Sequence, residues 1–503
     1  MRKAIWLPIV LAVPVAALLA ALLAAAPLRS ADNLLTLVPG RPLVAFHTAD
    51  FAGLTSRVRE LPAAGEYLKS KARDAYADSK LALKLADRAE RLGALAGMPL
   101  TLEALVAHAR SETVLALYDI GELQFLLILR LPAAEQAELA FVKNKAKFAQ
   151  RIYEGRTYWS QIDYATGIGF LFYQEDDLLF VATGADLLEG ALLAKAKPDA
   201  SPLLVHEADF QKLPAVNPEV THADATVFLD LQRLRDDRYF RAYWVWRNRA
   251  ELAAADAALV GFSCDGRAWR EQRAVLGSAT AAAAPELRYD GRGLVAFQSG
   301  GEGVTAQLRS FLGWDAAALN LENTATARLL VAAPYLDPQT GLWSLHAGAV
   351  LRETTRTPAE VAGTAAADLR QTHPALADRL SPQSAADGVV CLGTMAGAPG
   401  ICTARQGDLL FLAESDAFLR ELLARVKSGE PGPLHRATVA GGAAADLAKF
   451  LRQADDLGAI TDSGSEFAST TLVDLLRSAG SFAALSTVAV PVTGGWRQET
   501  VWQ

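Results

Sequence analysis

The hydrophobic pattern of the chain consists of short apolar runs, with helical stretches between some of them. Runs of strand length lie at 43–46, 113–118, 123–131, 157–164, 169–174 and 178–182. Thr166-Gly167 and Glu175-Asp176-Asp177 separate three of them and suit tight reversals. Apolar residues recur at helical spacing over 51–61 and 185–194. Strands at hairpin spacing predict an α+β fold in which a largely antiparallel sheet packs against helices, and they exclude a doubly wound dinucleotide-binding fold.

The chain also repeats its own sequence. GRPLVAF at 40–46 recurs as GRGLVAF at 291–297, and DLLFVA at 177–182 recurs as DLLFLA at 408–413. Shorter matches in the same order join 55–61 to 305–311, 225–227 to 437–439, and 269–270 to 496–497. Because chance matches would not keep one order, we predict two tandem homologous domains.

The predicted domain boundaries follow from these matches. The first α+β repeat covers 40–278 and the second covers 290–503, with a small, Ala-rich linker at 279–289. The first repeat is longer than the second. The excess lies near 68–110, where the spacing of Leu81, Leu85 and Leu92 predicts a helical insertion.

The N-terminus predicts export. Arg2 and Lys3 precede an uncharged run at 4–28, and a run of about 20 apolar residues can cross a bilayer as a helix. Residues 1–31 therefore form a membrane anchor or a signal segment. Ala24 and Ala26 resemble a cleavage site, although Pro27 directly follows it, so both readings stay open. We expect a single-pass protein of the bacterial inner membrane with its ectodomain outside the cytoplasm, in the periplasm.

Composition narrows the classes of function. The net charge of −7 argues against nucleic acid as a partner, since phosphate binding needs clustered Lys and Arg. The seven histidines lack metal-ligand spacing, G-x-S-x-G is absent, and the glycines at 300–303 lack the Lys of a phosphate loop. The sequence therefore predicts no catalytic, metal-binding or cofactor-binding residue.

Two features remain as candidates. Cys391 and Cys402 flank a turn at 396–397, and a hairpin there would set them opposite each other, as a disulfide or as two buried thiols. The segment 233–249 combines six arginines with aromatic residues, which are enriched at binding surfaces. Core packing is the alternative. The candidate docking residues are Arg238, Tyr239, Phe240, Tyr243, Trp244 and Trp246.

The GRxLVAF motif, the strand at 111–119 and the DLLF-[VL]-A motif resemble a group of bacterial envelope proteins with one N-terminal anchor and a duplicated exported domain of unknown function. The resemblance implies an envelope setting and transfers no site residue. Our leading hypothesis is a non-enzymatic binding or scaffold protein with an envelope protein as partner. The alternatives are a hydrolase of an envelope polymer, whose acidic residues meet only in the folded chain, and a carrier of an apolar ligand.

Overall fold

The computed structural model describes residues 33–70, 80–100, 108–109, 111–237, 255–278, 284–299, 327–352, 355–372, 381–384, 387–392, 401–431, 433–457 and 473–503. The predicted membrane segment and the six candidate docking residues lie outside these ranges. None of the helices within them combines the length and the apolar character that crossing a bilayer requires.

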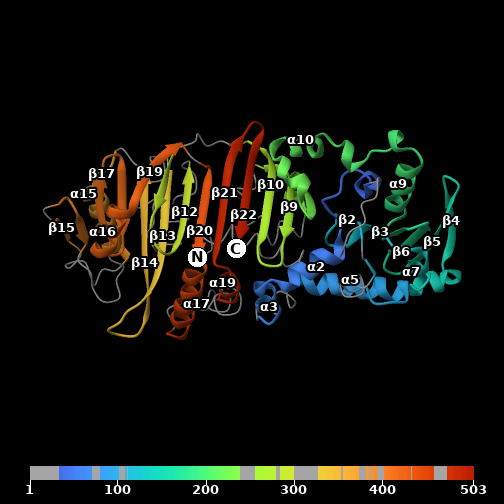
Figure 1. The fold of residues 1–503 in the computed structure, drawn as a ribbon, viewed down its shortest axis with the longest axis horizontal. Helices are drawn as coiled ribbons and strands as arrows, with labels where there is room; N and C mark the ends of the chain where they lie inside the picture. Colours follow the sequence, from blue (N-terminus) through green and yellow to red (C-terminus); the bar gives the residue numbers. More distant parts are fainter. Residues whose placement is uncertain are drawn as a thin grey trace.

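The fold is α+β and is dominated by one antiparallel sheet of 20 strands (Figure 1). The earlier strands are β1 (Val44–Thr48), β2 (Thr113–Asp119), β3 (Gln124–Arg130), β4 (Ala149–Tyr153), β5 (Arg156–Asp163), β6 (Ile168–Glu175), β7 (Leu178–Ala182), β8 (Ala225–Asp230), β9 (Ala255–Cys264) and β10 (Trp269–Gly277). The later ones are β12 (Leu294–Ser299), β13 (Ala327–Leu336), β14 (Trp343–Arg352), β15 (Pro382–Ser384), β16 (Val390–Leu392), β17 (Cys402–Gln406), β18 (Leu409–Ala413), β20 (His435–Ala440), β21 (Ala484–Val492) and β22 (Gly495–Trp502). A separate ribbon pairs β11 (Pro285–Tyr289) with β19 (Val426–Pro431).

The order of strands runs outward from a central pair, β10 and β22. On one side it reads β10-β9-β8-β1-β2-β3-β7-β6-β5-β4. On the other it reads β22-β21-β20-β12-β13-β14-β18-β17-β16-β15. Among the described strands, β4 and β15 therefore form the two ends of the sheet.

Helices pack against both faces. They are α2 (Phe51–Glu60), α3 (Pro62–Leu68), α5 (Lys80–Ala96), α7 (Ala133–Gln136), α8 (Ala140–Lys143), α9 (Ala185–Ala196), α10 (Ala208–Val216), α11 (Leu231–Asp236), α15 (Pro358–Thr372), α16 (Asp416–Arg425), α17 (Gly441–Asp456) and α19 (Val473–Gly480). Short 3-10 turns are η1 (Leu34–Leu37), η2 (Lys145–Lys147), η3 (Pro198–Ala200), η4 (Leu204–His206) and η5 (Pro218–His222). In Figure 1, α5, α2, α3, α19 and α17 follow one long side of the row of strands, and α9 and α10 lie on the other.

Local sequence explains where the first helices begin and end. The side chain of Asp50 accepts a hydrogen bond from the Gly53 N–H (2.9 Å) and so caps α2. Leu61 leaves the helical conformation, and Pro62 opens α3 at a position where its missing N–H costs nothing. The α2 face that carries Phe51 and Leu54 is buried against the sheet.

The core is shared across the central strand pair. One cluster of buried residues contains Val58 of α2 and Trp269 of β10 together with Val473 of α19 and Trp502 of β22. Trp269 and Trp502 are direct partners in the β10–β22 register. The parts of the chain before 278 and after 290 therefore bury apolar surface against each other.

The structure differs from two expectations. The sequence predicts a separate sheet in each repeat, but β10 and β22 pair and merge the strands into one sheet. The polar stretch 133–148 also predicts one helix, which the structure does not contain. These residues form α7, α8 and η2, because the extended backbone of Leu139 separates α7 from α8 and the non-helical Asn144 separates α8 from η2.

Candidate functional site

The predicted docking segment is described only at its beginning. Leu231 and Leu234 of α11 are buried in a small cluster with Leu43. Arg233 and Arg235 lie 3.8 Å and 3.9 Å from Asp230 and Asp256. The start of this segment thus packs into the fold, and docking by the residues beyond 237 stays a prediction.

Cys391 and Cys402 are direct partners on β16 and β17, and their Sγ atoms are bonded. Cys402 is buried beneath α16, in a cluster with Phe411 and Leu419. Cys264 is the third cysteine and is a buried free thiol. The disulfide thus ties the short strand β16 to the core of the sheet.

A buried carboxylate, Glu112, organises one end of β2. It is 6% exposed and accepts hydrogen bonds from the Leu34 N–H (2.8 Å) and from Arg130 Nε (3.0 Å). His47 Nε2 lies 3.1 Å from the same carboxylate. Burial opposes ionisation, but the hydrogen bonds from His47, Leu34 and Arg130 outweigh it and lower the pKa of Glu112. Because these contacts hold the carboxylate in place, Glu112 has a structural role and ties η1 to the sheet.

A second histidine and glutamate pair lies between β14 and α16. His346 Nδ1 is 2.7 Å from Glu414 Oε1, and Ser415 donates a hydrogen bond to the same oxygen (2.9 Å). The His346 ring is stacked between Tyr335 and Phe418, with centroid distances of 4.0 Å and 5.0 Å. A carboxylate that fixes Nδ1 of an imidazole leaves Nε2 as the nitrogen that can exchange a proton.

This pair was not predicted from the sequence. Glu414 is 68 residues from His346, so no local motif links them. The only signal was the glutamate that follows the DLLFLA strand, directly before the α16 N-cap Ser415.

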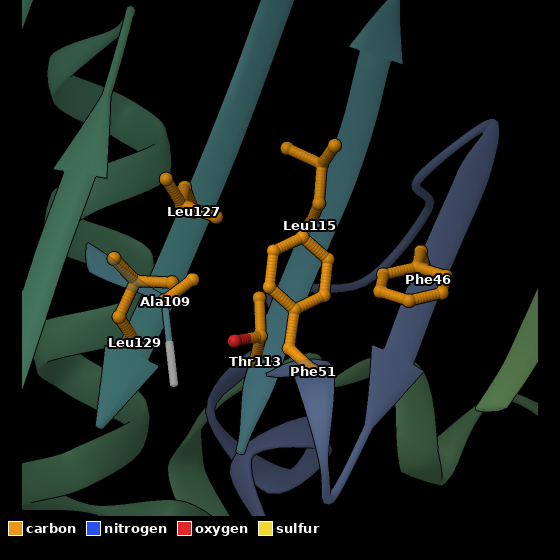
Figure 2. Close-up of a pocket in the computed structure, with 7 residues that line it drawn as sticks. All are labelled: Phe46, Phe51, Ala109, Thr113, Leu115, Leu127 and Leu129. Atoms are coloured by element: carbon orange, nitrogen blue, oxygen red, sulfur yellow. The ribbon is translucent and has the colours of Figure 1, made fainter. Parts of the chain in front are cut away.

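An apolar cavity lies between α2 and the sheet. Figure 2 shows the seven residues that line it: Phe46, Phe51, Ala109, Thr113, Leu115, Leu127 and Leu129. Its atom-free space is about 270 Å³ with the open mouth included. Because that volume includes open solvent, the enclosed part is far smaller than the roughly 300 Å³ at which pockets for drug-sized ligands start. The Thr113 hydroxyl donates to the Ser111 carbonyl (3.2 Å) and leaves the cavity apolar. The cavity could therefore hold only a small apolar group.

Both end strands of the sheet are exposed, β15 at all three of its residues and the longer strand β4 at most of its residues. Four of the five β4 residues are exposed, and the Ile152 side chain is 76% exposed. Sheet edges that are open in this way are the usual sites where proteins add a strand from a partner. Among the described residues, no three His, Cys, Asp or Glu side chains gather closely enough to hold a metal ion.

Comparison with known proteins adds little. No protein-family model matches the chain, and no curated protein matches it. Crystal forms I and III of TP0453 are similar over 50% of this chain and 82% of theirs. Their sequence identities are 11% and 10%, with TM-scores of 0.27 and 0.28, values too low to support an argument about fold or function.

Proposed function

We propose that this chain is a non-enzymatic binding or scaffold protein of the bacterial cell envelope, held at the inner membrane by residues 4–28. The observation that carries the proposal is the open β4 edge at one end of a 20-stranded sheet. A large sheet with an accessible edge suits a protein that holds partners. The uncharged N-terminal run, with Arg2 and Lys3 before it, supports the membrane setting.

We further propose that the ectodomain is a tandem duplication, as the repeated motifs predict. Asp177 and Asp408 open the two matched DLLF strands, and each contacts an arginine of the neighbouring strand, Arg130 at 3.1 Å and Arg352 respectively. The registers agree as well, because Arg130 is opposite Leu178 and Arg352 is opposite Leu409. The outward strand order from β10 and from β22 supports the same proposal.

The test of the binding proposal is capture from native membranes. Full-length tagged protein is crosslinked in its membranes and purified beside a Tyr243→Ala, Trp244→Ala, Trp246→Ala variant whose folding is checked by circular dichroism. A Leu457→Ala variant, at a side chain 67% exposed, is the control. We expect one identifiable envelope protein with the wild type and the control. Its loss from the triple variant would assign docking to the aromatic segment. Recovery of no partner from any sample would contradict the binding function.

His346 and Glu414 favour a second candidate, a hydrolase of an envelope polymer. A histidine oriented by a carboxylate can act as a general base. The test is release of soluble fragments from purified peptidoglycan or envelope polysaccharide, compared with His346→Asn and Glu414→Gln. Release that both substitutions abolish would favour the hydrolase over the scaffold. Release that is absent, or unchanged in both variants, would remove the pair as a catalytic site.

A further inference from the structure

The edge strand β4 presents backbone N–H and C=O groups with which another strand can pair. Among the described strands it pairs with β5 alone, and Figure 1 places it at one end of the long axis. Glu154 and Gly155 connect the two strands and have φ angles of 46° and 74°. This two-residue turn makes Tyr153 and Arg156 a hydrogen-bonded pair. Pairs alternate along the ladder, so the backbone N–H and C=O groups of Gln150 and Ile152 point away from β5.

The side chains around this edge are basic. Lys145 and Lys147 of η2 and Arg151 of β4 are exposed, and among the described residues none of the three forms an ion pair. Two nearby acids are already paired with lysines, Glu138 with Lys143 at 2.6 Å and Glu154 with Lys197 at 2.9 Å. A third, Glu189, accepts a hydrogen bond of 2.6 Å from Tyr158, the residue opposite Arg151. A local excess of positive charge therefore lies on a chain whose net charge is −7.

We propose that β4 accepts an extended acidic segment of a partner protein as an added strand. The inference rests on the proposed binding function and names the surface and the partner's chemistry. Backbone hydrogen bonds to Gln150 and Ile152 provide the docking, and carboxylates opposite Lys147 and Arg151 provide the selectivity.

Charge and geometry decide against two other occupants. A second copy of this chain, paired edge to edge so that Gln150 faces Ile152, would set Arg151 opposite its own equivalent, and like charges that face each other are destabilising. Lipid headgroups would meet the cations, but they cannot use outward N–H and C=O groups that alternate along a strand. Both occupants remain distinguishable in the test below.

The experiment measures binding of a fluorescent peptide of alternating valine and glutamate to the full-length protein in detergent. Ile152→Pro removes one outward N–H without removing a β4–β5 hydrogen bond, so the strand should stay folded. Ile152→Val is its matched control. A second pair compares Lys147→Glu, Arg151→Glu with Lys427→Glu, which reverses an exposed charge on the distant β19. The charge variants keep the edge testable if Ile152→Pro fails to fold.

We expect Ile152→Pro and the double charge reversal each to weaken binding by about tenfold, and both controls to bind as the wild type does. A peptide with lysine in place of glutamate should not bind. The proposal is overturned if the acidic peptide does not bind, or if it binds equally well to Ile152→Pro. Binding of phosphatidylglycerol vesicles that needs Arg151 but not the Ile152 N–H would overturn it in favour of a membrane surface. Concentration-dependent self-association that Ile152→Pro abolishes would overturn it in favour of a second copy.

The capture from native membranes distinguishes a wrong docking surface from a wrong binding function. If Ile152→Pro and the charge variant still recover the partner that the wild type recovers, the β4 edge is the wrong surface and the binding function stands. If neither the wild type nor any variant recovers a partner, the binding function itself falls.

Discussion

Gln272 and Glu499 face each other at the centre of the sheet, where Gln272 Nε2 donates a hydrogen bond of 2.7 Å to Glu499 Oε1. The two residues belong to β10 and β22, the strands that join the first and second parts of the chain. In the proposed duplication Trp269 matches Trp496, so Gln272 and Glu499 are the same position of the two halves. The contact then has the form of a two-fold symmetric interface, in which a position pairs with its own equivalent.

A charge placed at this contact should weaken the central strand pair. Gln272→Glu sets two carboxylates opposite each other, and we expect a loss of about 0.5–1 kcal/mol in the free energy of unfolding at pH 7. The double variant Gln272→Glu, Glu499→Gln restores one donor and one acceptor and should recover the loss. Urea unfolding of both variants checks this. Equal stability of the single and double variants would show that the contact adds nothing to the strand pair.

The sequence predicted the elements of the fold better than their assembly. The strand Leu178–Ala182 lies where the apolar run predicts it, because it is buried on both faces and bounded by turn residues. The pairing of β10 with β22 joins residues more than 200 positions apart and leaves no local pattern. The short edge strand β4 was missed because its residues are exposed and lack an apolar run.

The two GRxLVAF motifs match in sequence, but their phenylalanines do not lie on the same face of the sheet. Phe46 packs with Leu54 of α2, whereas Phe297 packs with Leu419 of α16. In the proposed duplication α9 matches α16, but the β1 residue whose side chain lies in the cluster under α9 is Ala45 and not Phe46. A shift of one residue moves a side chain to the other face of a strand. The identical residues Phe46 and Phe297 therefore lie on opposite faces of the sheet. Aligning β1 with β12 thus requires the burial of the side chains as well as the sequence match.

Glu112 should make the protein sensitive to acid. Its pKa is lowered in the folded chain, so its contribution is present above the ordinary carboxylate range near pH 4 and is lost as the pH falls further. Glu112→Gln removes the carboxylate that Arg130 Nε contacts, while Asp177 still pairs with the same guanidinium, and should cost about 1–3 kcal/mol at pH 7. Unfolding by guanidinium at pH 7 and pH 3 measures both effects. Glu219→Gln, at an exposed carboxylate, is the control, and similar losses in the two variants would contradict a structural role for Glu112.

His435 should make the stability of the folded chain depend on pH in a higher range than Glu112 does. Burial, and after it the positive charge of Arg328, lower the pKa of His435 from 6.5 to about 4. Between these values the unfolded chain binds a proton that the folded chain does not, so stability that is full above pH 6.5 declines as the pH falls toward 4. His435→Gln removes this proton uptake. The urea midpoint of the variant should fall less steeply across that range, whereas parallel curves would show that His435 does not contribute.

The Cys391–Cys402 disulfide should stabilise the β16 end of the sheet in an oxidising compartment. It closes a loop of 11 residues along the chain, for which loop entropy predicts about 3 kcal/mol. A Cys391→Ala, Cys402→Ala variant should lose about this much, and a reductant should weaken the wild type but not the variant. Free thiols at both positions in non-reducing peptide maps of protein from the periplasm would contradict the bond.

Trp502 tests whether the two parts of the chain unfold together. Its ring is 8% exposed, lies 5.4 Å from Phe482, and belongs to the cluster that also holds Trp269 of β10. Trp502→Ala should cost about 3–5 kcal/mol, because the cavity it leaves is bordered by side chains from both parts. Leu336→Ala, at a side chain 52% exposed, should change stability by less than about 0.5 kcal/mol.

Hydrogen exchange can distinguish one core shared by the two parts of the chain from two cores that are stable independently. If the cluster is one cooperative unit, Trp502→Ala should speed amide exchange in β10 and α2 as much as in β22 and α19, although the substitution lies in β22. Faster exchange confined to β22 and α19 would mean that each part of the chain is stable on its own. The central strand pair would then be a docking contact between two domains, and a binding partner could open it without unfolding either one.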